Sequence, residues 1–165
     1  MTNNQSEHVA TYLNDHLAGA IAALELLARL EEAQAGTSAA GVLAELRAEI
    51  AADRQSLETL MSRLQINESR PRQAMAWLAE RASRIKLRLG DSSDGPLGRL
   101  EALEALALGI DGKRALWQAL AAAAEDAPEL AEANYDHLTQ RADAQRHRVE
   151  ELRLEAARIA LGGVR

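Results

Sequence analysis

The sequence predicts an all-α helical bundle, and three observations support this prediction. Ala and Leu dominate the 165 residues, and strong helix formers such as Glu, Arg and Gln fill most polar positions. β-branched residues are scarce and Phe is absent. Between the turn residues, apolar side chains recur every three or four positions, as in a helix that lies against other helices. A chain of this length can bury one core of its own.

The first part of the chain predicts two helices, over residues 6–35 and 38–65, joined by a very short turn. Ser6 is a candidate N-cap of the first helix, and Gly36 is a candidate stop signal at its end. A turn this short makes the two helices antiparallel neighbours. Each of them carries one polar residue in its apolar seam, His16 in the first helix and Asp53 in the second.

Residues 71–89 predict a shorter, basic helix that can cross the length of the bundle. Pro71 is suited to its first turn. Six basic residues and one acid lie within residues 70–88, although the formal net charge of the chain is −6. One face carries Arg81, Arg84, Arg88 and Trp77. This face either binds an anionic ligand or a partner protein, or its arginines pair with acidic residues of the bundle.

The last part of the chain predicts two long helices, over residues 96–125 and 128–160, with Pro128 placed to start the second. The apolar seam of the first contains Lys113, and that of the second contains Gln145. Gly109 and Gly112 lie inside the first helix, where a glycine costs about 1 kcal/mol relative to alanine. Their presence indicates either the close approach of another backbone or a local irregularity.

One polar residue from each long helix is expected in a layer near the middle of the bundle: His16, Asp53, Lys113 and Gln145. Within each helix pair, the two positions lie at levels that agree to roughly 6 Å at the helical rise per residue. Three further residues lie on the flanks of these seams: Glu25, Glu104 and Arg141. Because an unpaired buried charge is costly, such groups bond one another or water. The layer either only fixes the helix register or binds a ligand or metal, unless the seams are rotated and these groups face water.

Composition excludes several classes of function. A net charge of −6 argues against non-specific nucleic-acid binding, and the lack of Cys excludes disulfides and thiolate chemistry. The first residues have neither the basic nor the apolar region of a signal peptide. No uncharged run approaches the roughly 20 residues that a membrane span needs. We therefore expect a cytoplasmic protein.

Two helical hairpins joined by a long crossover resemble the ferritin-like four-helix-bundle superfamily. The stretches LALGIDGKRALWQAL and RADAQRHRVEELRLEAA are similar to those of uncharacterised bacterial proteins in that group. The resemblance implies a pair of metal ions that activate oxygen, held by Glu and Glu-x-x-His motifs. No Glu-x-x-His occurs in this sequence, and the nearest carboxylate counterparts are Glu25, Asp53 and Glu104.

The predicted function is therefore a non-enzymatic binding or interaction module without a cofactor, whose partner is a protein or an anionic small molecule. The alternative is an atypical member of the superfamily that handles oxygen or binds iron, manganese or zinc. Its ligands would be His16, Glu25, Asp53 and Glu104. The Ala-rich helix faces are also compatible with a homodimer.

Overall fold

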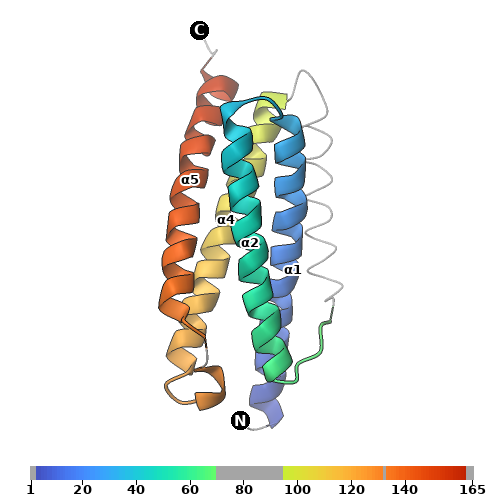
Figure 1. Cartoon of the computed structure of the whole chain (residues 1–165), viewed down its shortest axis with the longest axis vertical. Coiled ribbons are helices and arrows are strands. Elements are labelled where there is room, and N and C mark those ends of the chain that lie inside the picture. The colour runs from blue at the N-terminus through green and yellow to red at the C-terminus, as the bar shows by residue number, and fades with distance from the viewer. Residues whose placement is uncertain (1–2, 70–94, 132, 163–165) are drawn as a thin grey trace.

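The computed structural model describes residues 3–69, 95–131 and 133–162. Within these ranges the chain forms long helices that lie side by side, and it forms no strand (Figure 1). The helices are α1 (Asn3–Ala33), α2 (Ser38–Arg63), α4 (Gly95–Ala123) and α5 (Tyr135–Leu161), with a short 3-10 helix, η1 (Pro128–Leu130), before α5. The prediction of an all-α protein is confirmed.

Each long helix packs against two others. α1 contacts α2 and α4, and α5 contacts α4 and α2. In Figure 1, α1 and α5 run upward while α2 and α4 run downward, so each helix is antiparallel to both helices that it contacts. The four helices therefore enclose one shared interior. None of the helices in the described part of the chain combines the length and the apolar content that crossing a bilayer requires.

The turn between α1 and α2 is as short as predicted. α1 ends at Ala33, and Gly36 has a φ of 81°, a left-handed conformation that glycine adopts without strain. Thr37 then precedes α2 with an extended backbone. The start of α1 differs from the prediction, because the helix already begins at Asn3. Ser6 consequently lies within the helix and is not its N-cap.

The connection between α4 and α5 shows that the prediction of one helix over residues 128–160 was wrong. Pro128 starts only η1, whose last residue, Leu130, is buried. α5 begins at Tyr135, because the side chain of Asn134 accepts a hydrogen bond (3.0 Å) from a backbone N–H in the first turn. The Tyr135 hydroxyl donates to the carbonyl of Leu130 (2.6 Å), which fastens the connection to the core.

The predicted helix over residues 71–89 lies outside the described residues. So does the predicted anion or partner surface, which consists of Trp77, Arg81, Arg84 and Arg88.

The apolar core consists of two clusters, one toward each end of the bundle. The cluster nearer the α1–α2 turn includes Leu30, Leu43, Ile50, Leu106 and Ile110, and the cluster nearer η1 includes Leu13, Leu57, Leu116 and Trp117. The interruption between them falls at Asp53 on α2 and at Lys113 on α4. The middle of the bundle is thus the level at which polar groups replace apolar packing.

Asn14 is a buried polar residue that the sequence analysis missed. Its amide group donates to the carbonyls of Ala10 (2.9 Å) and Asn67 (3.3 Å), and its side-chain oxygen accepts from the N–H of Ser69 (2.6 Å). These bonds hold the segment after α2 against α1. The helical spacing could have indicated that Asn14 is buried, because it lies four residues before the buried Ala18, on the same face of α1.

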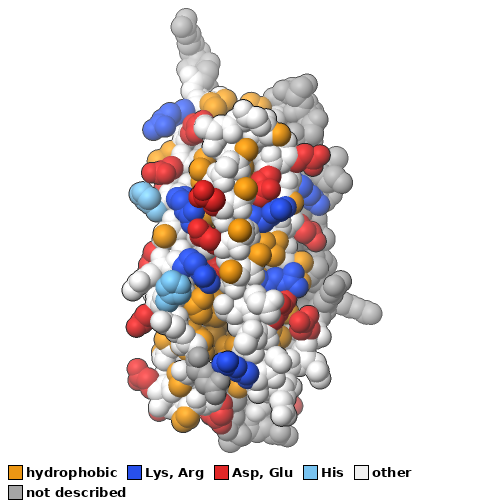
Figure 2. All heavy atoms as spheres, viewed as in Figure 1, with side chains coloured by type: hydrophobic (Ala, Val, Ile, Leu, Met, Phe, Trp, Pro, Cys, Tyr) orange, Lys and Arg blue, Asp and Glu red, His pale blue; other side chains and the backbone are white. Residues whose placement is uncertain are grey.

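Charged side chains of both signs are interspersed on the face shown in Figure 2, with hydrophobic side chains scattered among them. Ion pairs at such exposed positions contribute little to stability, because water and salt screen them. The polar contacts that matter most energetically are therefore the buried ones at mid-bundle.

Candidate functional site

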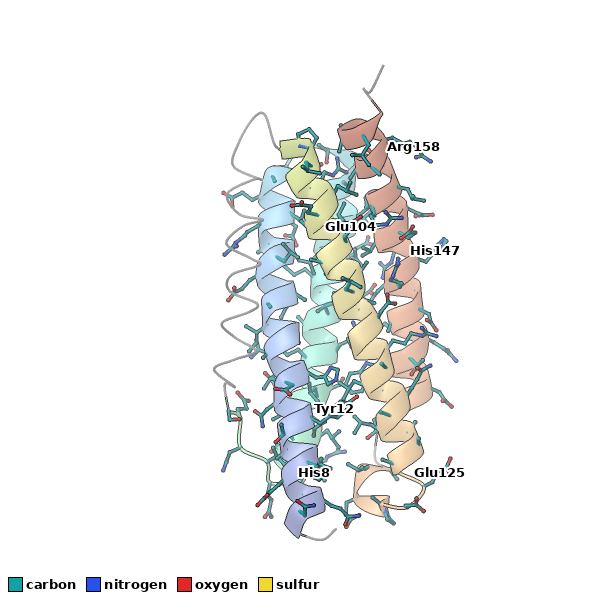
Figure 3. The ribbon with its side chains drawn as sticks, turned by 180° about the vertical axis from the view of Figure 1, so that it is seen from behind. His8, Tyr12, Glu104, Glu125, His147 and Arg158 are labelled. Atoms are coloured by element: carbon teal, nitrogen blue, oxygen red, sulfur yellow. The ribbon has the colours of Figure 1, made fainter. Side chains whose placement is uncertain are left out.

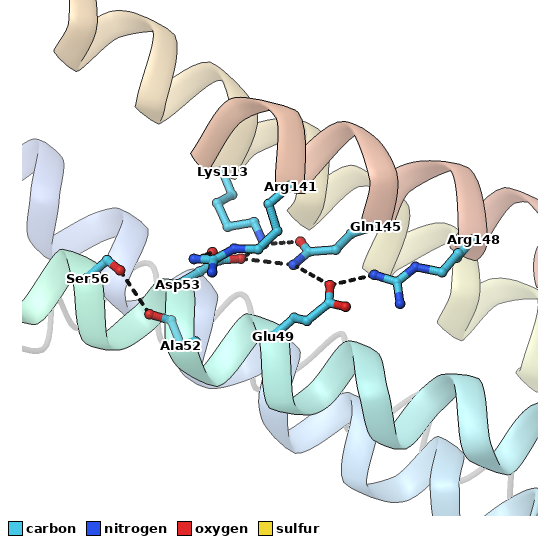
Figure 4. Close-up of polar contacts among 8 residues, drawn as sticks. All are labelled: Glu49, Ala52, Asp53, Ser56, Lys113, Arg141, Gln145 and Arg148. Atoms are coloured by element: carbon cyan, nitrogen blue, oxygen red, sulfur yellow. Dashed lines mark hydrogen bonds and ion pairs between the residues drawn. The ribbon is translucent and has the colours of Figure 1, made fainter. Parts of the chain in front are cut away.

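Three of the four predicted polar residues meet in the interior. Asp53 from α2, Lys113 from α4 and Gln145 from α5 form one hydrogen-bonded group (Figure 4). The Lys113 ammonium donates to Asp53 Oδ2 and to Gln145 Oε1, and Gln145 Nε2 donates to Asp53 Oδ2 (3.1 Å). The side chains of Asp53 and Lys113 are 2% and 13% exposed, and Gln145 is 0% exposed. A polar layer is thus present, and it joins three helices.

The layer continues from Asp53 toward the surface between α2 and α5. Arg141 forms an ion pair with Asp53 Oδ1. This position agrees with the predicted place of Arg141 on the flank of the layer. Gln145 Nε2 also donates to Glu49 Oε2 (3.1 Å), and Arg148 donates to the same oxygen (2.5 Å). The sequence analysis missed the roles of Glu49 and Arg148. The sequence contained a signal for both roles. Glu49 lies one turn before Asp53 on α2, and Arg148 lies two turns after Arg141 on α5, so each pair shares one face of its helix.

The electrostatics of Lys113 follow from its burial. Burial lowers the pKa of the Lys113 ammonium, and the charge of Asp53 and its hydrogen bond oppose this shift. Removing one partner from such a group would leave a buried charge uncompensated.

A partly open cavity of about 180 Å³ lies beside this layer, between α1, α2 and α4, and two of its lining residues, Asp15 and Gly109, are exposed. Lys113 and Asp53 form part of its wall, and the rest of the charged or polar wall comes from Asp15, His16 and Arg54. The remaining lining is apolar or glycine: Gly19, Ala20, Ala23, Ile50, Leu57, Gly109, Ile110, Gly112, Leu116 and Trp117. Cavities of roughly 150 Å³ hold a benzene ring in other proteins, so this one has room for a small organic molecule.

The glycines of α4 have a different role from the predicted one. A Cβ atom built on Gly109 or Gly112 would meet no atom within 4 Å, and the same holds for Gly19 on α1. The prediction of a close backbone approach was therefore wrong, and α4 runs through both positions without a break. The missing side chains leave open space, and all three glycines line the cavity.

His16 lies in the cavity wall rather than within the hydrogen-bonded group. In the described structure no hydrogen bond joins it to Asp53 or Lys113, and its ring instead packs edge-on against Tyr12 (4.6 Å between ring centroids). Burial lowers the pKa of the half-buried His16 imidazole, and the charge of Asp15 partly offsets this effect. Asp53 and His16 consequently do not form a catalytic base and its orienting partner.

Trp117 lines the same cavity from α4 and is 1% exposed. Its indole stacks on Tyr135 at 6.4 Å between ring centroids. The indole N–H is buried and has no hydrogen-bond partner among the described residues. Buried donors are nearly always satisfied, so this unpaired N–H is an exception within the described structure.

Glu25 and Glu104 do not belong to the buried layer, so this part of the prediction was wrong. Both side chains are exposed, and Glu104 faces Arg153 on α5 (3.6 Å). Figure 3 shows Glu104 in the upper part of α4, far above Tyr12 on α1. Each glutamate is nine residues from the polar residue of its helix, which is roughly 13 Å along the axis and too far to share a ligand.

The residues predicted to bind a metal ion are therefore not brought together. Asp53 is held by Lys113, Gln145 and Arg141, and the two cations would repel a metal ion. Among the described residues, no group of three or more His, Asp or Glu side chains is arranged to hold a metal ion.

No family model, curated protein or solved structure matches the chain. Its family and function are therefore proposed from its own residues.

Proposed function

We propose that this chain is a ferritin-like bundle that works as a non-enzymatic binding module, with a small ligand in the cavity between α1, α2 and α4. The direction of the helices supports the architecture. α2 and α4 run the same way while every contacting pair is antiparallel, which is the arrangement expected of two hairpins joined by one long crossover (Figure 1).

The observation that carries the binding proposal is the wall of glycines. A glycine inside a helix costs about 0.8–1 kcal/mol relative to alanine, and three of them line one cavity. None is needed for packing, because a Cβ atom would meet nothing at any of them. Lys113 lines the same space. An apolar cavity with a few converging polar groups is the usual form of a small-molecule site.

The bonding of the layer favours binding over catalysis. The carboxylate of Asp53 is shared by Lys113, Gln145 and Arg141, so it is not free to accept a proton from a substrate. Lys113 donates to Asp53 and Gln145, and the charge of Asp53 favours its ammonium form, whereas a nucleophilic amine must be neutral. Together they form a fixed polar wall.

Binding can be tested by the fluorescence of Trp117. Replacing Trp77 by Phe leaves Trp117 as the single tryptophan, and it lines the cavity. Toluene, benzamide, benzoate and benzylammonium are similar in size and differ in polarity and charge. We expect at least one of them to give a saturable change in fluorescence.

A cavity-filling variant provides the control. Gly109→Leu places a side chain at the cavity wall and should abolish the fluorescence change. Gly41→Leu adds the same side chain to α2, where there is also open space but outside this cavity, and it should leave the change intact. No response to any probe, or an undiminished response in folded Gly109→Leu, contradicts the proposal.

A further inference from the structure

Two residues of the cavity wall, Lys113 and Trp117, have hydrogen-bond donors to spare. Lys113 has three N–H groups, and Asp53 and Gln145 accept two of them. Trp117 is a donor only, and its indole N–H has no partner in the described structure. Asp53 Oδ2 accepts from Lys113 and Gln145. Asp53 Oδ1 accepts no hydrogen bond in the described structure but is ion-paired with Arg141. A ligand that completes this wall therefore has to present hydrogen-bond acceptors.

The charge beside the cavity has a definite sign. Asp53 is one carboxylate held by two cations, Lys113 and Arg141. This group of three carries a net charge of +1, and only a small part of the Lys113 side chain reaches water. A ligand that displaces water from Lys113 weakens its solvation further, so an anionic ligand is favoured because it restores charge balance.

The other charges near the cavity do not reverse this balance. Arg54 is paired with Glu58 (2.6 Å), and Arg148 is paired with Glu49 (2.5 Å). Asp15 also lines the cavity, but its side chain is exposed, where water and salt screen its charge. His16 is half-buried and can donate or accept, so it accommodates a carboxylate without opposing it.

We infer that the cavity binds a small monocarboxylate with a compact apolar body, whose carboxylate accepts a hydrogen bond from Lys113 Nζ while the body occupies the space left by Gly19, Gly109 and Gly112. This inference rests on the proposed binding function and adds the chemical class of the ligand. The volume of about 180 Å³ limits the body to about one ring or a short branched chain.

Titration calorimetry with four matched probes tests the class of ligand on the unmodified protein. Benzoate should bind about tenfold or more tightly than benzamide, because a charge-assisted hydrogen bond is roughly twice as strong as a neutral one. Toluene should bind more weakly still, and benzylammonium should not bind. These comparisons need no variant, so they hold whether or not a substitution disturbs folding.

Two variants of α4 then test whether Lys113 binds the carboxylate. Lys113→Met should weaken benzoate binding about tenfold and leave benzamide binding within about twofold. Arg114→Met removes the same charge from the next residue, which pairs with Asp143 (2.8 Å) and does not line the cavity, so it should change neither affinity.

The failures of the two proposals are distinguishable. If benzamide or toluene binds and benzoate binds no better, the cavity is a ligand site but the carboxylate inference is overturned. Preference for benzylammonium overturns it as well, as does a benzoate affinity that Lys113→Met and Arg114→Met lower equally. If none of the four probes binds, the proposed function fails together with the inference.

Discussion

Replacing Gly109 and Gly112 together by alanine should stabilise the protein. Both residues lie inside α4, where an alanine is favoured over a glycine by about 0.8–1 kcal/mol. Much of this gain arises because alanine restricts the unfolded chain. The added methyl groups meet no atom within 4 Å, so no clash reduces the gain. The double variant should therefore raise the free energy of unfolding by about 1.5–2 kcal/mol.

Urea denaturation measures this change directly. Helix content by circular dichroism and tryptophan fluorescence should give coincident transitions, with an unchanged dependence on urea concentration. In a thermal scan, a gain of this size raises the midpoint by about 3–8 °C for a chain of this length. Gly41→Ala in α2 is the matched control, because a Cβ atom there also meets nothing and the site is outside the cavity.

The control decides how a negative result is interpreted. If Gly41→Ala stabilises and the α4 double variant destabilises, another group occupies the space beside α4, and the reasoning about the cavity wall is refuted. If Gly41→Ala and the α4 double variant both stabilise the protein, but the double variant keeps full affinity for the probes, then the space left by the glycines is larger than the ligand needs. The expected result is a more stable protein with a narrower cavity and weaker binding.

Three further predictions concern polar residues. Asp53→Leu should lower the free energy of unfolding in a urea melt by about 3–5 kcal/mol, because it leaves two cations without their shared carboxylate. The control Asp143→Leu removes an exposed ion pair and should change the free energy of unfolding by less than about 1 kcal/mol. Because burial lowers the pKa of His16, the unfolded chain binds more protons below pH 6.5, so stability rises with pH up to about 6.5. His16→Gln should reduce this rise in urea melts at about pH 5 to 7. Asn14→Ala should lower the free energy of unfolding by about 1–3 kcal/mol and speed proteolysis after α2, and an unchanged cleavage rate would contradict its anchoring role.

The helices were predictable from sequence because their seams are regular. On α2, the predicted seam runs from Leu43 to Leu64, and every position except Leu64 at the end of the helix is buried, Asp53 included. The same regularity brought Asp53, Lys113 and Gln145 to one level, since equal rise per residue fixes the height of each position. Helix starts were less predictable. Asn134 caps α5 with a side chain whose geometry depends on the preceding turn, and Pro128 gave a competing signal.

The cavity was not predictable, because it depends on what the neighbouring helices fail to fill. Gly109 in a sequence is equally compatible with a tight helix contact and with open space, and only the relative placement of α1 and α4 distinguishes them. The same limit applied to His16. Its position in the seam gave the right level, but its ring packs against Tyr12, one turn earlier on α1, and lines the cavity without bonding to Asp53.

Several features that are costly to stability lie at one level of this bundle. Above and below it, the described core is mostly apolar, although Asn14 is a buried polar residue and Gly41 is another unpacked helical glycine. At that level stand a buried ion pair, three unpacked glycines and a buried indole N–H without a partner. A layer that served only to fix the register would need the ion pair and neither of the other features. A binding site accounts for all three, because it needs the charge, the space and the spare donor together.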